Sequence, residues 1–243
     1  MPNFKDITAT LNSLANPEQA LILQRFFKTA PGQYGAGDIF LGIKVPVQRQ
    51  VAREFQTLPL SALGRLLKSK IHEYRLVALL ILIKKYEAAS DIKTKREIFD
   101  FYLNNFSAIN NWDLVDLSAP KIVGDFLFNH YQNRRVPVLR FLSNLADSSN
   151  LWEKRIAIIS TFYFIYQGRT RETYYIAKKL LSDKHDLIHK AVGWMLREAG
   201  KRVDRQELLN FLNTHKSLMP RTALRYAIEH LPEPERRSYL TKK

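Results

Sequence analysis

The fold of this chain is decided by the stretch from Glu73 to Tyr86, which reads EYRLVALLILIKKY. Leu76, Leu79 and Ile83 recur at the three- and four-residue spacing that places side chains on one face of an α-helix. The uninterrupted apolar part, from Leu76 to Ile83, is too short to cross a bilayer. The stretch therefore predicts a helix within a protein core.

Helical periodicity continues along nearly the whole chain. Turn and capping residues, such as Asp-Ser-Ser-Asn at 147–150 and Pro-Glu-Pro at 232–234, separate the helical segments. No segment alternates strictly enough to indicate a β-strand, so we expect an all-α fold. Besides the first helix, helices are predicted over residues 58–70, 91–104, 113–128, 136–145, 152–166, 171–181, 187–199, 205–212 and 221–231.

The predicted helices also repeat, with similar apolar patterns at spacings of 38, 42, 36 and 30 residues. A period of about 40 residues with two helices per unit is typical of a HEAT-like solenoid. Each unit of such an array buries its apolar face only against its neighbours, so we predict a single domain over residues 1–243 with a concave surface. The patterns begin at Arg75, Asp113, Arg155, Ala191 and Arg221.

In the predicted solenoid, the second helix of every repeat begins at the same edge. Basic and aromatic side chains recur there, and helix N-termini add backbone N–H groups that suit phosphate oxygens. We interpret the edge as a basic DNA-binding surface, and the alternative is a solvated charged edge. Its residues are Arg75, Trp112, Trp152, Lys154, Arg155, Lys190 and Arg221.

The charge of the chain favours a polyanionic partner. Thirty-eight Lys and Arg residues oppose 23 Asp and Glu residues, which gives a net charge of +15. The basic residues are spread through many helices, whereas membrane-surface binding requires them to gather opposite a bare apolar face. Cysteine is absent, which excludes thiol catalysis and thiolate metal sites, and no signal pattern begins the chain. We expect a cytoplasmic, nucleoid-associated protein that does not bind membranes.

The stretch Trp112-Asp113-Leu114-Val115-Asp116 carries the clearest functional pattern. On a helix, the indole of Trp112 and the carboxylate of Asp116 point the same way, because they lie four residues apart. Trp152 and Trp194 also lie within four residues of charged side chains. Indole faces and a carboxylate could together stabilise a cationic sugar on a nucleic acid. The alternative is that the tryptophans are core residues.

Several separated motifs resemble one family, the AlkD-type DNA glycosylases, which are HEAT-like-repeat enzymes of alkylpurine repair. The resemblance covers about residues 15–230 and keeps the order of the motifs. It is carried by Trp112-Asp113-Leu114-Val115-Asp116 with Gly124-Asp125, by Trp152 with Arg155, by the stretch KAVGWMLRE at 190–198, and by FLGI at 40–43 with Pro46 and Arg49.

The resemblance implies a function and roles for individual residues. It implies a monofunctional DNA glycosylase that excises positively charged N-alkylated purines, such as N3-methyladenine and N7-methylguanine, from duplex DNA without a base-flipping pocket. Trp112, Asp116 and Trp194 would frame the damaged nucleotide, and Arg155, with Arg197 as a helper, would hold the backbone. Lys154, Lys190 and Trp152 join the DNA-binding candidates from the basic edge. We expect a monomer with no obligate protein partner.

The chemistry of the reaction suits these residues. As the glycosidic bond of a cationic purine lengthens, positive charge moves onto the deoxyribose, and Asp116 can stabilise that charge and orient a water molecule. Indoles can attract the same developing cation. No metal or organic cofactor is required. Of the six histidines, only His185 and His189 have a ligand-like spacing, and we interpret the histidines as surface residues.

Two departures from the family pattern concern the N-terminal region. Phe26 lies where the resemblance leads us to expect a tyrosine that reaches DNA. Residues 31–38, PGQYGAGD, look like an insertion that is either a mobile loop beside the lesion or a long helix connection. Phe26 would lack the hydroxyl contact of that tyrosine with DNA. The segment 31–38 leaves the lesion range open, including whether bulky adducts are accepted.

The sequence is also compatible with two other functions. One is a catalytically silent HEAT-like protein that binds DNA or RNA by charge. The other is a protein-binding solenoid scaffold, since such arrays commonly bind proteins. The intact set of Trp112, Asp116, Arg155 and Trp194 favours the enzyme.

Overall fold

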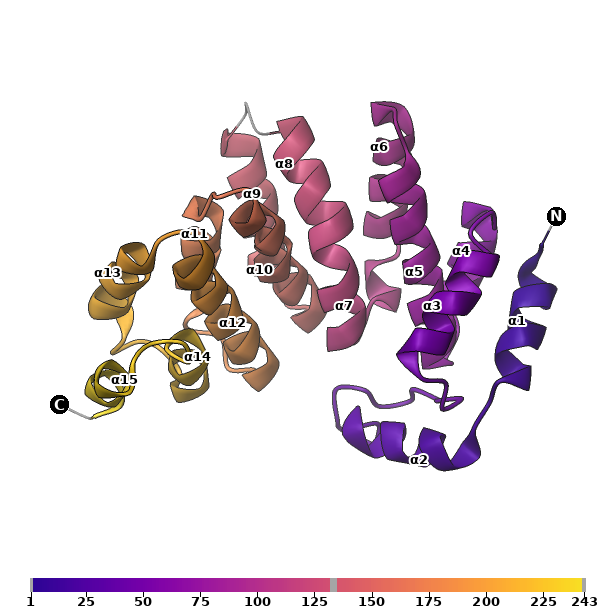
Figure 1. The fold of residues 1–243 in the computed structure, drawn as a ribbon, viewed down its shortest axis with the longest axis horizontal. Coiled ribbons are helices and arrows are strands. Elements are labelled where there is room, and N and C mark those ends of the chain that lie inside the picture. Colours follow the sequence, from indigo (N-terminus) through magenta and orange to yellow (C-terminus); the bar gives the residue numbers. More distant parts are fainter. Residues whose placement is uncertain (1, 132–134, 242–243) are drawn as a thin grey trace. The chain divides into compact units, whose positions relative to one another are not determined.

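The computed structural model describes residues 2–131 and 135–241. Within these ranges the regular elements are helices, and Ile39 and Ile71 form one isolated parallel β-bridge. The predicted all-α fold is therefore confirmed (Figure 1). The elements are α1 (Phe4–Ser13), α2 (Pro17–Phe26), α3 (Val45–Glu54), α4 (Leu60–Leu67), α5 (His72–Ala88), α6 (Ile92–Leu103), η1 (Phe106–Ala108), α7 (Trp112–Ala119), η2 (Pro120–Gly124), α8 (Asp125–Tyr131), α9 (Arg135–Ala146), α10 (Leu151–Tyr166), α11 (Arg171–Leu180), α12 (Asp186–Arg202), α13 (Arg205–His215), α14 (Arg221–Ala227) and α15 (Glu233–Leu240).

The chain forms two compact units, residues 1–114 and 115–243, with the boundary inside α7. In the first unit, α5 packs against α3, α4 and α6. In the second unit, α10 packs against α12 and α12 against α14, while α9, α11 and α13 flank these helices. This serial stacking of helix pairs is the helical-repeat architecture that the sequence predicts. The extent of a single domain stays a prediction.

Helix α5 is the centre of the first unit. The sequence predicts one apolar face, but Leu79 and Ile81, which point in nearly opposite directions, are both fully buried. Neighbouring helices pack on several sides of α5, so its apolar run is buried nearly all round.

The predicted helix over residues 113–128 is interrupted. A π-helical turn, η2, separates α7 from α8. Pro120 begins this turn and has no N–H with which to continue the α-helical hydrogen bonds. At Gly124, a Cβ atom would lie 2.4 Å from the carbonyl oxygen of Ser160, so the missing side chain allows η2 to approach α10 closely.

The N-terminal helices were not predicted, and α2 differs from the others. None of its residues is buried, and Leu21, Ile22 and Phe26 are exposed.

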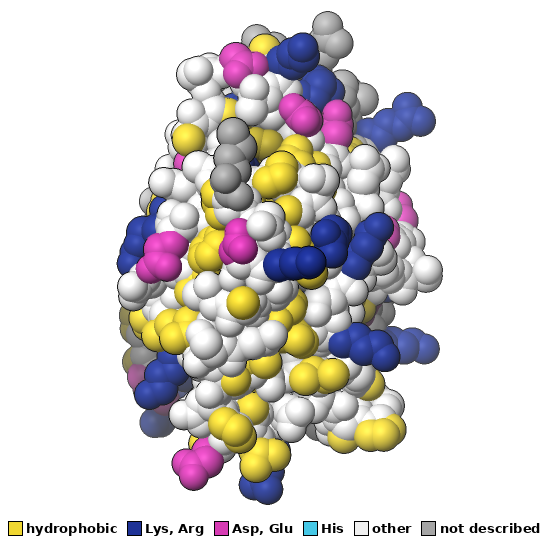
Figure 2. Space-filling model, turned by 90° about the vertical axis from the view of Figure 1, so that its right-hand side faces the viewer, with side chains coloured by type: hydrophobic (Ala, Val, Ile, Leu, Met, Phe, Trp, Pro, Cys, Tyr) yellow, Lys and Arg dark blue, Asp and Glu magenta, His cyan; other side chains and the backbone are white. Residues whose placement is uncertain are grey.

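On the face shown in Figure 2, Lys and Arg side chains are scattered among hydrophobic ones, so basic charge is not separated there from apolar surface. No helix among the described residues is long and apolar enough to cross a membrane.

Candidate functional site

Trp112 begins α7 and stands on an aromatic support. Its backbone N–H donates to the side-chain oxygen of Asn111 at 2.8 Å, which satisfies a free donor of the first helical turn. The indole is half-buried and stacks on Phe27, with ring centroids 5.3 Å apart and an angle of 16° between the planes. Phe26 meets the indole edge-on at 5.9 Å. Because Phe26 is 61% exposed, an aromatic surface continues from Trp112 to the solvent.

His72 lies behind this aromatic support. Its ring is 4.6 Å from Phe40 and 5.0 Å from Phe27, measured between centroids, and the residue is 1% exposed. The prediction that the histidines are surface residues is therefore wrong for His72. Burial is possible because two carboxylates, from Asp38 and Asp113, face its two ring nitrogens.

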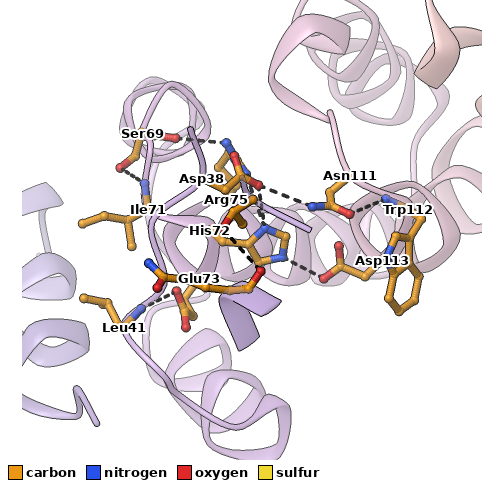
Figure 3. Close-up of polar contacts among 12 residues, drawn as sticks. Asp38, Leu41, Ser69, Ile71, His72, Glu73, Arg75, Asn111, Trp112 and Asp113 are labelled. Atoms are coloured by element: carbon orange, nitrogen blue, oxygen red, sulfur yellow. Dashed lines mark hydrogen bonds and ion pairs between the residues drawn. The ribbon is translucent and has the colours of Figure 1, made fainter. Parts of the chain in front are cut away.

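The two carboxylates determine the charge of His72. Its Nε2 lies 2.8 Å from Asp113 Oδ2, and its Nδ1 lies 3.3 Å from Asp38 Oδ2 (Figure 3). Burial lowers the pKa of His72, but attraction to Asp113 and hydrogen bonds to both carboxylates outweigh this effect and raise the pKa to about 9. His72 is therefore an imidazolium at neutral pH, donating from both nitrogens.

Asp38 ends the segment 31–38 that the sequence marked as an insertion. Burial raises the pKa of its carboxyl group, but hydrogen bonds from His72 and Arg75 lower the pKa further than burial raises it. Arg75 Nη2 donates to Asp38 Oδ2 at 2.6 Å. The segment is thus part of the connection between α2 and α3, and its last residue is fixed in the interior of the first unit. Arg75, expected on the basic edge, is buried as the partner of this carboxylate.

Asp116 is held by Arg155 within the second unit. Arg155 Nε donates to Oδ1 at 2.8 Å and Nη2 donates to Oδ2 at 2.7 Å, a bidentate pair. Arg155 Nη1 donates to the carbonyl oxygen of Leu187, in the first turn of α12, at 2.5 Å. The side chain of Arg155 is 6% exposed and that of Asp116 is 17% exposed, so the carboxylate keeps a solvent-accessible part while its orientation is fixed.

The sequence did not predict this pairing of Asp116 with Arg155. The structure gives Arg155 the role of carboxylate partner, and its contact with a DNA backbone stays a prediction. One signal was present in the sequence. Ile156, Ile158 and Ile159 follow Arg155 directly, and all three are fully buried. An arginine at the start of a helix buried all round lacks open solvent and needs an internal partner.

Trp194 and Arg197 lie on α12. The indole of Trp194 is half-buried and lies 5.5 Å from the ring of Phe162. At the preceding Gly193, a Cβ atom would lie 2.5 Å from the carbonyl oxygen of Ala223, so α12 and α14 pack closely where Trp194 emerges. Arg197 pairs with Glu198 at 2.9 Å and with Glu229. These contacts fix the two side chains on one helix.

The other predicted DNA-binding residues differ in their exposure. Trp152 is 8% exposed and belongs to the core of the second unit. Its contact with DNA stays a prediction, and little of its surface is accessible for such a contact. Lys154 donates to Asp183 at 2.7 Å, and Lys190, whose side chain is 40% exposed, pairs with Asp186 at 2.8 Å. Each of these lysines therefore has an acidic neighbour that a phosphate group would have to replace.

A cavity of about 570 Å³ in the second unit brings further lysines to Lys154. Lys179, at the end of α11, and Lys184, in the turn between α11 and α12, line this cavity and were not identified from the sequence. Among the described residues, no group of three or more His, Asp or Glu side chains could hold a metal ion.

Comparisons with known proteins agree with the resemblance in the sequence. The family model of the DNA alkylation repair enzymes matches residues 7–231. A solved structure named as a predicted DNA alkylation repair enzyme from Enterococcus faecalis is similar, with a TM-score of 0.67 and 17% sequence identity, over 90% of this chain and 97% of that chain. That likeness shows the fold. No curated protein matches the chain significantly. The chain belongs to the DNA alkylation repair enzyme family, as its sequence motifs predict.

Proposed function

We propose that this protein is a DNA glycosylase that hydrolyses the N-glycosidic bond of positively charged N-alkylated purines in duplex DNA. The observation that supports this most directly is the carboxylate of Asp116, which Arg155 holds by both oxygens one helical turn after Trp112 on α7. The substrates would be N3-methyladenine, N7-methylguanine and bulkier adducts of the same charge. The damaged base would leave without entering a base-flipping pocket.

The proposed reaction breaks the bond between C1′ of the deoxyribose and the purine nitrogen. The bonding electron pair moves to the cationic purine, which leaves as a neutral free base. The sugar becomes an oxocarbenium ion, water adds to C1′, and the proton that water loses passes to solvent. Because alkylation already makes the base a good leaving group, the protein has no need to protonate it.

Asp116 is suited to stabilise the oxocarbenium ion. A carboxylate whose orientation is fixed before the reaction needs no rearrangement when the positive charge develops. Arg155 supplies this orientation from α10 and also binds the first turn of α12. The accessible part of the Asp116 side chain leaves room for the sugar and a water molecule.

The two half-buried indoles would contact the damaged nucleotide. Trp112 is backed by Phe27, and Trp194 lies against Phe162. An indole supported in this way presents a rigid, electron-rich surface to a cation. In the proposal, both indoles pack against the nucleotide, and the damaged base stays in the duplex.

Duplex DNA would be held by charge. The net charge of +15 favours encounter with DNA, and Lys154, Lys190 and Arg197 would exchange their acidic neighbours for phosphate groups. The enzyme would act as a monomer, without a metal or an organic cofactor, in the cytoplasm at the nucleoid.

The test is release of free base from a duplex that carries one N7-methylguanine or N3-methyladenine. We expect chromatography to show release of the free alkylpurine at the same rate with wild type and with Asp100→Asn, an exposed carboxylate on α6 that serves as a control. With Asp116→Asn, release should be slower by about 10²-fold or more. Duplex binding without base release would instead indicate a silent DNA-binding protein. Neither binding nor release would favour a protein scaffold.

The size of the adduct tests the absence of a base pocket. A closed pocket rejects large alkyl groups steeply, whereas a base that stays stacked leaves its modified edge in the groove. We expect single-turnover release to fall only modestly from methyl to much larger N-alkyl purines, and uracil to remain in the DNA. Rapid removal of uracil, or loss of all activity beyond methyl, would contradict this part of the proposal.

A further inference from the structure

Both sequence neighbours of Trp112 are tied to buried polar groups. Asn111, which is fully buried, accepts the backbone N–H of Trp112 and donates from Nδ2 to Asp38 Oδ2 at 3.4 Å. On the other side, Asp113 Oδ2 accepts from His72 Nε2 at 2.8 Å. The backbone of Trp112 is therefore held from positions 111 and 113 at once (Figure 3).

Both sets of contacts lead to one oxygen atom, Asp38 Oδ2. Asn111 contacts this atom directly, and His72, which binds Asp113, contacts it as well. Asp38 Oδ2 faces Arg75 Nη2 at 2.6 Å, His72 Nδ1 at 3.3 Å and Asn111 Nδ2 at 3.4 Å. Together with Asp113, the group holds two carboxylates and two cations, so its charges balance in the interior. Removal of one charged member leaves an uncompensated buried charge, which is far more costly than the intact pairing.

His72 also contacts the support of the indole. Its ring stacks on Phe40 at an angle of 20° and lies against Phe27, which in turn stacks on Trp112. His72 thus reaches Trp112 by two routes, one through the polar group at the start of α7 and one through the ring of Phe27.

We propose that His72 is a positioning residue for substrate recognition, which fixes the indole of Trp112 by donating hydrogen bonds to Asp38 and Asp113 and by stacking behind Phe27. The proposal rests on the function proposed above, in which Trp112 contacts the damaged nucleotide. Because Asp38 lies within the connection between α2 and α3, the same contacts fix that part of the connection relative to Trp112.

Only a doubly protonated ring makes both hydrogen bonds. The charged groups that face His72 are Asp38 from the α2–α3 connection, Arg75 from α5 and Asp113 from α7. The two carboxylates favour the imidazolium and Arg75 opposes it, with a resulting pKa of about 9. Above this pH the ring keeps one proton and loses one of the two hydrogen bonds, so the hold on Trp112 weakens without any mutation.

The experiment follows the accessibility of Trp112 by its fluorescence. In a Trp152→Phe, Trp194→Phe background, Trp112 is the sole tryptophan, and acrylamide quenching reports how tightly it is held. We expect His72→Gln to raise the quenching constant about twofold through local opening. The matched control is His230→Gln, at an exposed histidine, which should leave the constant unchanged.

Excision is measured in the chain with all three tryptophans. We expect His72→Gln to slow single-turnover release about 10-fold through misplacement of the indole, with duplex binding unchanged. The quenching measurement does not depend on catalysis. If wild type releases no base but His72→Gln loosens Trp112, the proposed function fails and the positioning role stands.

A titration of the Trp112-only protein covers the case in which His72→Gln does not fold. Quenching should rise as the pH passes through about 9, while far-ultraviolet circular dichroism stays constant. A quenching constant that does not change across this pH range would overturn the proposal. Equal quenching constants for the Trp112-only protein with His72 and for its folded His72→Gln variant would overturn it as well.

Discussion

Helix α7 carries two aspartates, Asp113 and Asp116, that are nearly equally exposed but have different partners. Their side chains are 16% and 17% exposed. Asp113 binds His72 in the first unit, and Asp116 binds Arg155 in the second. Exposure alone therefore does not separate the proposed catalytic carboxylate from the one that holds the helix.

The partners make the two carboxylates behave differently. An imidazolium can lose its proton, whereas a guanidinium keeps its charge throughout the physiological range. Arg155 also engages both oxygens of Asp116, while Asp113 Oδ1 is buried without a hydrogen-bond partner among the described residues. We expect the group at Asp113 to depend on pH through His72.

The largest expected effect is on catalysis at Asp116. Asp116→Asn keeps the shape of the side chain but removes its charge, so excision should slow by about 10²-fold or more, the usual scale for loss of one electrostatic catalyst. Binding to undamaged duplex should stay nearly constant. The measurement is single-turnover base release, and a rate within about threefold of wild type would remove Asp116 from the mechanism.

The next effect is the pH dependence of stability that His72 introduces. The pKa of His72 is raised from 6.5 to about 9, so its contribution is fully present below pH 6.5 and is lost as the pH rises through about 9. The shift corresponds to roughly 3 kcal/mol of unfolding free energy. Urea unfolding between pH 6 and 10 should show this loss in wild type and in Asp116→Asn, but not in His72→Gln. Equal curves for wild type and His72→Gln would contradict it.

A smaller effect is expected when the bidentate pair is weakened. Arg155→Lys keeps the charge but offers a single nitrogen, so the orientation of Asp116 loosens and excision, measured as single-turnover base release, should slow about 10-fold.

The salt dependence of duplex binding tests whether Arg155 instead contacts the DNA backbone. If Arg155 contacts a phosphate group, Arg155→Ala should lower the slope of log K against log salt by about 0.9. An unchanged slope would show that Arg155 makes no phosphate contact.

The smallest effects concern the surface lysines. Lys190→Ala should weaken duplex binding only a few-fold and lower the salt slope by about 0.9, without changing the rate of base release from bound DNA. Lys179→Ala, at the cavity beside Lys154, is the parallel test for a residue that the sequence did not mark. A slope equal to that of wild type would exclude the mutated lysine as a phosphate contact.

The amino-acid sequence by itself determined most of the helices between residues 58 and 231 and the residues of α7. The apolar spacing in α5 and the separation of Trp112 from Asp116 are local features, since a helix repeats every few residues whatever surrounds it. For this reason the all-α repeat architecture and the family could be predicted. The local pattern gave a wrong prediction at Pro120, because it indicated a continuous helix over residues 113–128 where the structure has a π-helical turn.

Only the tertiary structure decided which charges are paired. His72 lies 41 residues from Asp113, and Arg155 lies 39 residues from Asp116, separations at which periodicity carries no information. From the sequence alone, a charged side chain is predicted to be exposed to solvent. Packing of the helices can place an opposite charge beside it and so allow its burial. Burial of His72 and Arg155 is favourable only in the presence of those partners, so their positions follow from the fold and not from their own neighbours in the chain.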